Sequence, residues 1–230
     1  LTTLNLDNVG KLKNLDGLAD LPALGSLSLV HSGRDQRYGR PLHSKLVDIS
    51  ALATLPSLHT LEMQNHDEIS WTGLTGVQGL TTLKLTDCWT IARVDPKRSA
   101  PAVLDAIGHL ESLEALHFEK AYGLSDLGPL ASLKKLRVLA MPKVETGRDD
   151  APLSLDALQG LDRLESLDVG DARIASLTPL SGLVSLKKLR IPRTVRDLSP
   201  LKALDQLAHD VTIKRGKAYR DGQELKGIDL

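Results

Sequence analysis

The residues with the greatest capacity for chemistry in this chain are few and scattered. The 230 residues include seven histidines and one cysteine, Cys88. Three histidines, His31, His66 and His117, are far apart in sequence, and zinc needs three or four ligands that converge on one point. The chain contains no H-E-x-x-H motif, no cysteine pair, no Gly-x-Ser-x-Gly motif and no phosphate-binding glycine loop. We therefore expect no enzyme activity, no cofactor and no metal site.

Composition narrows the classes of protein further. Acidic and basic residues number 29 each, and a formal net charge of zero argues against a nucleic-acid binder held by bulk charge. One cysteine cannot form an internal disulfide, and no apolar run approaches the roughly 18–20 residues of a membrane span. Leucine supplies 47 residues and aromatic residues only 3% of the chain. We therefore expect an aliphatic core.

The leucines recur in a fixed phrase, Leu-x-x-Leu-x-Leu with conservative replacements, and this repeat is the strongest signal in the sequence. Copies begin at residues 1, 24, 58, 80, 113, 136, 164 and 186, and a degenerate ninth copy begins at residue 208. The shorter spacings give a basal period of about 22 residues. Apolar and polar residues alternate within each phrase, which indicates a half-buried strand. A period this short holds one strand, so the strands must stack in parallel.

Between the phrases, leucine or isoleucine returns every third residue. Such runs occupy residues 12–24, 49–58, 124–133 and 174–186. Residues i and i+3 eclipse in a 3₁₀ turn, so we expect 3₁₀ turns, short helices and loops on the face opposite the sheet. The alternative is a leucine-rich helical bundle. Pro129, Pro179 and Pro200 oppose it, because each precedes a leucine of a run and would break a long helix.

Three segments resemble the short leucine-rich repeat of bacterial internalins. They are residues 124–130 (LSDLGPL), 174–180 (IASLTPL) and 195–201 (VRDLSPL). The resemblance extends from residue 1 to about residue 213. It implies an α/β fold, a leucine-rich-repeat solenoid with a parallel β-sheet on its concave face. It also implies a curved, non-catalytic scaffold that binds proteins.

The chain departs from that family at the ninth repeat position, where the family usually has an asparagine that bonds to neighbouring backbone. Mostly small or apolar residues stand there: Val9, Ser32, His66, Cys88, Ala121, Val144, Ala172, Thr194 and Gly216. Backbone groups at this bend therefore need other partners. We interpret Cys88 as a small buried side chain rather than a reactive thiol.

We divide the chain into a repeat array of about nine repeats, residues 1–210, and a hairpin-like cap, residues 211–230, which contains an Asp-Gly turn signal. The second, fourth and sixth repeats are long. Their insertions cover about residues 32–46, 90–102 and 145–152. Leu1 already occupies the first position of a repeat, and a solenoid needs a cap at each end. We therefore expect the chain to be a piece of a longer protein with further domains upstream.

Two surfaces stand out by their place in the repeat and in the charge pattern. The fifth repeat position faces the concave side, and its row is mixed in charge: Asn5, Ser28, Glu62, Lys84, His117, Ala140, Asp168, Arg190 and Thr212. This row is either a solvated face or a polar protein-binding surface. Residues 186–220 hold ten basic and three acidic residues. This end suits an acidic partner or phosphates, or it is simply solvated.

The flank that carries the insertions is a third candidate. Trp89 and Tyr122 both occupy the tenth repeat position, and aromatic residues and arginine commonly anchor interfaces. Trp89 could instead pack under its own insertion, whereas Trp71 takes a core position and should be buried. We place the partner site on this flank and the adjoining strand ends, at Arg34, Arg37, Tyr38, Arg40, Lys84, Trp89, Arg93, His117 and Tyr122. The predicted partner is a protein with an acidic rim.

These features give three functional hypotheses. The first is the ligand-sensing part of a larger bacterial protein such as an NTPase-type immune receptor, which would be cytoplasmic. The second is an internalin-like adhesin at the cell surface, for which upstream sequence would supply a signal peptide. The third is a regulatory or targeting domain of an attached enzyme. All three rest on analogy of fold.

Overall fold

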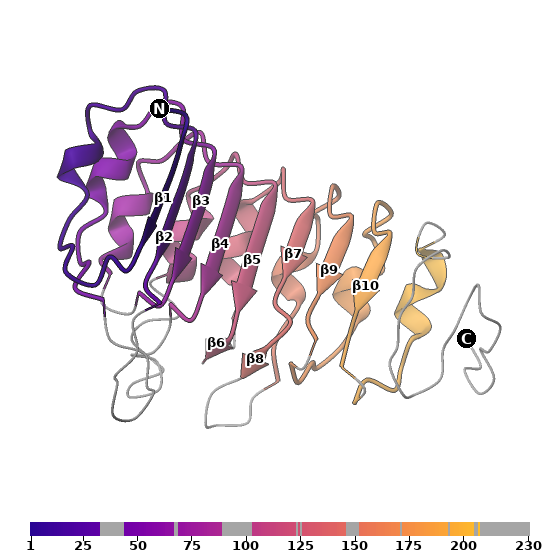
Figure 1. Ribbon diagram of the computed structural model, residues 1–230. Helices are drawn as coiled ribbons and strands as arrows, with labels where there is room; N and C mark the ends of the chain where they lie inside the picture. The colour runs from indigo at the N-terminus through magenta and orange to yellow at the C-terminus, as the bar shows by residue number, and fades with distance from the viewer. Residues whose placement is uncertain are drawn as a thin grey trace, which may run out of the picture.

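The strands of the repeats form one open, all-parallel sheet, seen side by side in the computed structural model of Figure 1. The structure describes residues 1–32, 44–66, 69–88, 103–122, 124, 126–145, 152–170, 172–192, 194–204 and 207. In spatial order the strands are β1 (Thr3–Asp7), β2 (Ser26–Val30), β3 (Thr60–Gln64), β4 (Thr82–Thr86), β5 (Ala115–Glu119), β7 (Val138–Ala140), β9 (Ser166–Asp168) and β10 (Lys188–Arg190). This sheet confirms the predicted solenoid for the first eight repeats.

The pairing register follows the leucine phrase. Leu27 pairs with Leu61, and Leu61 with Leu83, so the fourth positions of successive repeats align. The fourth and sixth positions point inward, and Leu27 and Leu29 are fully buried. Because side chains alternate between the two faces of a strand, the third, fifth and seventh positions lie on the opposite face. We call that opposite face the concave face.

The three-residue leucine step is a ladder of 3₁₀ hydrogen bonds. The backbone N–H of Leu52 donates to the carbonyl oxygen of Ile49, that of Leu55 to Leu52 and that of Leu58 to Leu55, over 3.0–3.2 Å. The 3₁₀ helices are η1 (Asp16–Leu18), η2 (Ser50–Thr54), η3 (Trp71–Leu74), η5 (Gly128–Ser132), η6 (Asp156–Leu158), η7 (Thr178–Leu180) and η8 (Ser199–Ala203). They lie behind the sheet in Figure 1. Residues 103–108 form one turn or more of α-helix on the same side.

A side-chain oxygen fixes the start of several of these turns. The carboxylate of Asp48 accepts the backbone N–H of Ser50 at 2.8 Å, and Asp197 does the same for Ser199 at 2.9 Å. The bonds from Ser50 lower the pKa of Asp48 below its ordinary value. Short polar side chains that bond to the backbone two residues ahead favour such turns. Pro129, Pro179 and Pro200 are the second residues of η5, η7 and η8, in the first turn of each, where no backbone N–H is needed.

The bend after each strand shows how the missing asparagine is replaced. The eighth residue of four repeats has a left-handed backbone: φ is 58° at Asn8, 59° at Asn65, 51° at Asp87 and 60° at Lys120. At the ninth position, His66 and Cys88 are buried. His66 is a large polar side chain at this position, and it takes over the hydrogen-bonding role that the missing asparagine leaves open.

Both ninth-position side chains bond to the sixth residue of the preceding repeat. His66 Nε2 lies 3.1 Å from the carbonyl oxygen of Leu29, and the Cys88 thiol donates to the carbonyl oxygen of Met63 at 3.3 Å. A carbonyl only accepts, so Nε2 of His66 carries the proton. Nδ1 then accepts from the hydroxyl of Ser44 at 2.8 Å. The predicted burial of Cys88 is confirmed, at 3% exposure.

A second, two-stranded sheet lies beyond the ends of β5 and β7 (Figure 1). β6 (Ala121–Tyr122) pairs in parallel with β8 (Val144–Glu145), so the repeats stay joined past the bend. Trp71 is 7% exposed within the core, as predicted. The ninth phrase, the 211–230 cap and most of the three insertions lie outside the described residues. No helix in the described part of the chain is long and apolar enough to cross a membrane.

Candidate functional site

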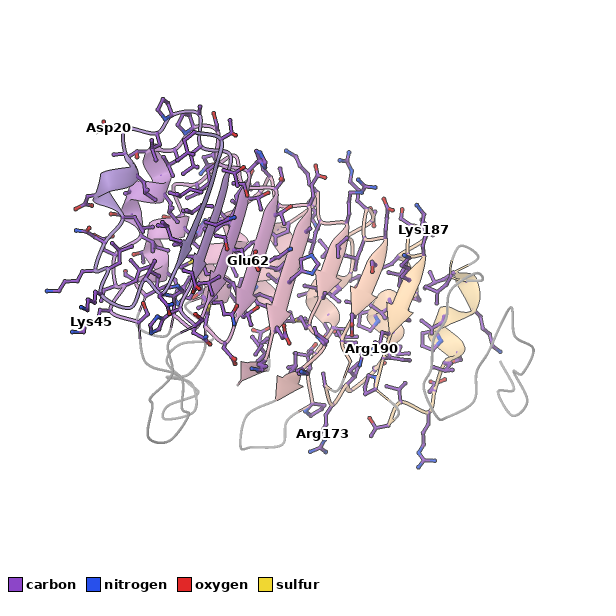
Figure 2. All side chains as sticks on the ribbon, viewed as in Figure 1. Asp20, Lys45, Glu62, Arg173, Lys187 and Arg190 are labelled. Atoms are coloured by element: carbon purple, nitrogen blue, oxygen red, sulfur yellow. The ribbon has the colours of Figure 1, made fainter. Side chains whose placement is uncertain are left out.

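The centre of the concave face carries three polar side chains on adjacent strands. Glu62 of β3 pairs in register with Lys84 of β4, and Lys84 pairs with His117 of β5. Equivalent residues of adjacent strands are roughly 4.8 Å apart. Figure 2 shows Glu62 over this face of the sheet. We call Glu62, Lys84 and His117 the central patch.

Small neighbours leave the central patch accessible. The third-position residues of the same strands are Thr60, Thr82 and Ala115, which stand beside the longer side chains on the concave face. Lys84 is exposed, and Glu62 and His117 are partly exposed. A partner that approaches this face therefore meets the functional ends of the patch side chains.

The charges of the central patch are not neutralised by each other. Neither Glu62 nor Lys84 forms an ion pair with any residue that the structure describes. Partial burial, and then the nearby charge of Lys84, lower the pKa of His117 below its ordinary value of 6.5. By contrast, Arg190 donates to Asp168 at 3.1 Å further along the same row. The patch thus offers a free carboxylate, a free ammonium and a neutral imidazole at neutral pH.

Two ion pairs reinforce the edge at which the strands end. Lys120 pairs with Asp87, and the Lys143 ammonium lies 3.7 Å from the Glu119 carboxylate. These contacts join the fourth, fifth and sixth repeats. The backbone of Tyr122 lies at the same edge in β6, directly after the bend at Lys120.

The structure brings together only part of the predicted partner site. Lys84 and His117 are adjacent, and Tyr122 lies beyond the end of the strand that carries His117. The remaining predicted residues lie outside the described part of the chain: Arg34, Arg37, Tyr38, Arg40, Trp89 and Arg93. The placement of the partner site on the insertion flank therefore stays a prediction.

Sequence reasoning missed a row of charges at the opposite edge, where the strands begin. Glu165 accepts from Arg137, with a shortest distance of 2.7 Å, and from Lys187 at 3.1 Å. These bonds lower the pKa of Glu165. Glu114 continues the row on the other side of Arg137 and raises the pKa of Arg137 together with Glu165. All four residues occupy the second repeat position, which alternates in sign and could have revealed the row.

The histidines do not form a metal site within the described ranges, where no group of three or more His, Cys, Asp or Glu side chains is placed to hold an ion. His66 is committed to Leu29 and Ser44, and His117 faces the concave side. His31 is 5% exposed, and in the described part of the chain neither ring nitrogen has a hydrogen-bond partner. The absence of catalytic and metal chemistry stays a prediction.

Comparison with known proteins identifies the fold. Neither a protein-family model nor a curated protein matches the sequence. Among solved structures, internalin C2 of Listeria monocytogenes superposes with a TM-score of 0.60 at 20% identity, over 89% of this chain and 77% of that one. Internalin InlF of the same organism gives 0.59 at 20% identity, over 93% of this chain and 54% of that one. The chain is thus a leucine-rich-repeat solenoid with the fold seen in these bacterial internalins.

Proposed function

We propose that this chain is a non-catalytic recognition module that binds a protein partner through the central patch of its concave face. The observation that carries the proposal is the in-register row of Glu62, Lys84 and His117, in which the charges of Glu62 and Lys84 have no ion-pair partner among the described residues. Charges that a protein leaves unpaired on a rigid surface are available to a partner. Fold likeness to internalins supports a binding scaffold by analogy.

The rigidity of the sheet favours binding. β3, β4 and β5 are paired over five residues each, so their backbone is already ordered before a partner arrives. Binding then costs mainly the ordering of a few side chains, roughly 0.5–1.5 kcal/mol for each. A carboxylate at one side of the patch and two basic side chains at the other give orientation and selectivity more than raw affinity.

We propose that the partner also contacts the insertion flank, next to the central patch. Arginine and aromatic side chains of the first two insertions would supply anchors, and Tyr122 would supply another from β6. The ion pairs Lys120–Asp87 and Lys143–Glu119 support this arrangement, because they hold the adjoining strand ends together. Since the flank set is mainly basic, the expected partner has an acidic rim.

Two settings compete for the module. In the first it senses a ligand for a larger cytoplasmic bacterial protein, such as an NTPase-type immune receptor. In the second it is an adhesin at the cell surface, which the likeness to internalins favours. A regulatory or targeting domain of an attached enzyme is a further alternative. The upstream part of the gene decides between them: an NTPase domain supports the first setting and a signal peptide the second.

Selection from a displayed protein library tests the binding surface. Binders selected on the native chain should lose affinity at least about tenfold, about 1.4 kcal/mol, for the double variant Lys84→Glu, His117→Ala. The matched control is Lys13→Glu, an exposed lysine far from the central patch. A triple variant, Arg37→Ala, Trp89→Ala and Tyr122→Ala, reports on the flank. If the triple variant abolished binding and the double variant kept its full affinity, the binding site would lie on the flank alone.

A further inference from the structure

A second docking surface lies at the edge where the strands of the last repeats begin. Figure 2 shows Lys187 at this edge and Arg190 on the sheet face, so the basic C-terminal part of the array is divided between two surfaces. The edge is a shallow depression that gathers charged residues from three consecutive repeats. Its lining residues are Glu114, Lys135, Arg137, Arg163, Glu165 and Ser185. We call this depression the strand-start edge.

Two rows of residues make up the strand-start edge, and they differ in charge balance. In the first row Glu165 pairs with both Arg137 and Lys187, so that row is largely neutralised from within. In the second row Lys135 and Arg163 precede the first leucines of adjacent repeats, Leu136 and Leu164. Both cations are exposed, and neither has an ion pair or hydrogen bond to a described residue. The depression therefore keeps an uncompensated positive charge.

We infer that the strand-start edge binds an acidic segment of a protein partner, with one carboxylate set between Lys135 and Arg163. Equivalent residues of adjacent repeats lie roughly 4.8 Å apart, a spacing that lets one carboxylate meet both cations. A guanidinium donates two parallel hydrogen bonds to one carboxylate. The partly exposed Ser185 lines the same depression and can donate a further hydrogen bond.

The acids in the depression favour a peptide over a uniform polyanion. Glu114 and Glu165 stand among the cations, and they would repel a backbone that carries a phosphate at every step. A peptide avoids this repulsion, because its carboxylates can be spaced and its neutral residues can face Glu114. The edge thus distinguishes an acidic peptide from a uniform polyanion by the spacing of the negative charges on the ligand rather than by their total number.

A second copy of this chain is a poor occupant for the same edge. The first row, Glu114, Arg137, Glu165 and Lys187, alternates in sign and would match itself under a two-fold axis. The same axis, however, sets Lys135 against Arg163 of the other copy, which brings like charges together. An external acidic partner satisfies these two cations, whereas self-association does not.

The inference is independent of the central patch, and fluorescence anisotropy with the full 230-residue chain tests it. The probe is a labelled peptide in which glutamates alternate with serines, measured at about 0.05 M salt so that screening is limited. We expect the native chain to bind it, and the double variant Lys135→Glu, Arg163→Glu to weaken binding at least about tenfold. Glu114→Gln should strengthen binding, an effect that a purely structural role for these residues would not produce.

Controls separate the edge from net charge and from the concave face. Lys13→Glu with Lys45→Glu makes the same change in net charge at exposed lysines far from the edge, and it should leave binding unchanged. Arg190→Gln, a change on the sheet face outside the central patch, should also leave it unchanged. Equal loss in any of these controls would overturn the inference. The inference would also be overturned if the native chain did not bind the peptide. It would be overturned as well if an oligothymidylate bound more tightly than the peptide and the double edge variant abolished that binding, because the edge would then be a polyanion site.

Discussion

His66 Nε2 donates to the backbone carbonyl oxygen of Leu29 at 3.1 Å, across the boundary between two repeats. Its other ring nitrogen accepts from Ser44, and the Ser44 hydroxyl oxygen accepts the backbone N–H of Leu46 at 3.1 Å. One buried imidazole thus joins the bend of the third repeat to the sixth residue of the second repeat and to the last residues of the first insertion. A histidine performs here the task that an asparagine performs in the repeats that this chain resembles.

The first prediction is that this histidine is required for stability. His66→Leu removes the donor to Leu29 and the acceptor for Ser44 while it keeps an apolar side chain in the core. Leaving these two buried groups without partners should lower the free energy of unfolding by about 1–3 kcal/mol. Urea denaturation followed by circular dichroism measures the change. His66→Asn should recover part of it, and an equal loss in both variants would contradict the hydrogen-bonding role.

The second prediction concerns His31, a buried histidine that lacks the hydrogen bonds that His66 forms. His31 is 5% exposed, and neither of its ring nitrogens has a hydrogen-bond partner among the residues that the structure describes. His31→Leu removes these polar atoms from the interior, so the free energy of unfolding should stay equal to that of the native chain or rise. The same denaturation experiment compares His31→Leu with His66→Leu. A loss at His31 as large as the loss at His66 would show that the ring of His31 has a partner after all.

The third prediction is a pH dependence that originates on the concave face. Partial burial and Lys84 lower the pKa of His117 in the folded chain, whereas the unfolded value is about 6.5. The unfolded chain then binds the proton more readily, so stability falls as the pH drops from about 6.5 through the lowered folded pKa. His117→Gln should flatten this part of the profile. Thermal melts at a series of pH values, with His59→Gln as control, provide the measurement.

The fourth prediction concerns the charge row at the strand-start edge. Glu165→Gln removes the acceptor shared by Arg137 and Lys187, and it should lower the melting temperature slightly at low salt. The difference should vanish near 1 M salt, where the screening length is about 3 Å. Because the folded pKa of Glu165 is lowered, its contribution should also disappear as the pH falls through that pKa. Asp168→Asn, which breaks a separate pair with Arg190, tests whether the effects add.

Periodic features of the chain could be predicted from sequence because burial enforces them. The strands, the 3₁₀ turns and the burial of Trp71 and Cys88 all follow from the spacing of the leucines. The role of His66 could not be predicted, because a histidine at a bend usually reaches solvent and nothing in the sequence shows the carbonyl that it meets. The charge row of the strand-start edge could have been found from the second repeat position, whereas the depression that its residues line is visible only in the structure.

Each strand of the main sheet is hydrogen-bonded only to the strands of the repeats on either side, from β1 at one end to β10 at the other. The array has no contact that links distant repeats through that sheet, so its stability is the sum of local junctions. A force applied between the two ends would therefore detach repeats one after another instead of breaking the whole array at once. Each detachment would release roughly 75 Å of extended chain, so the array would lengthen in steps under load.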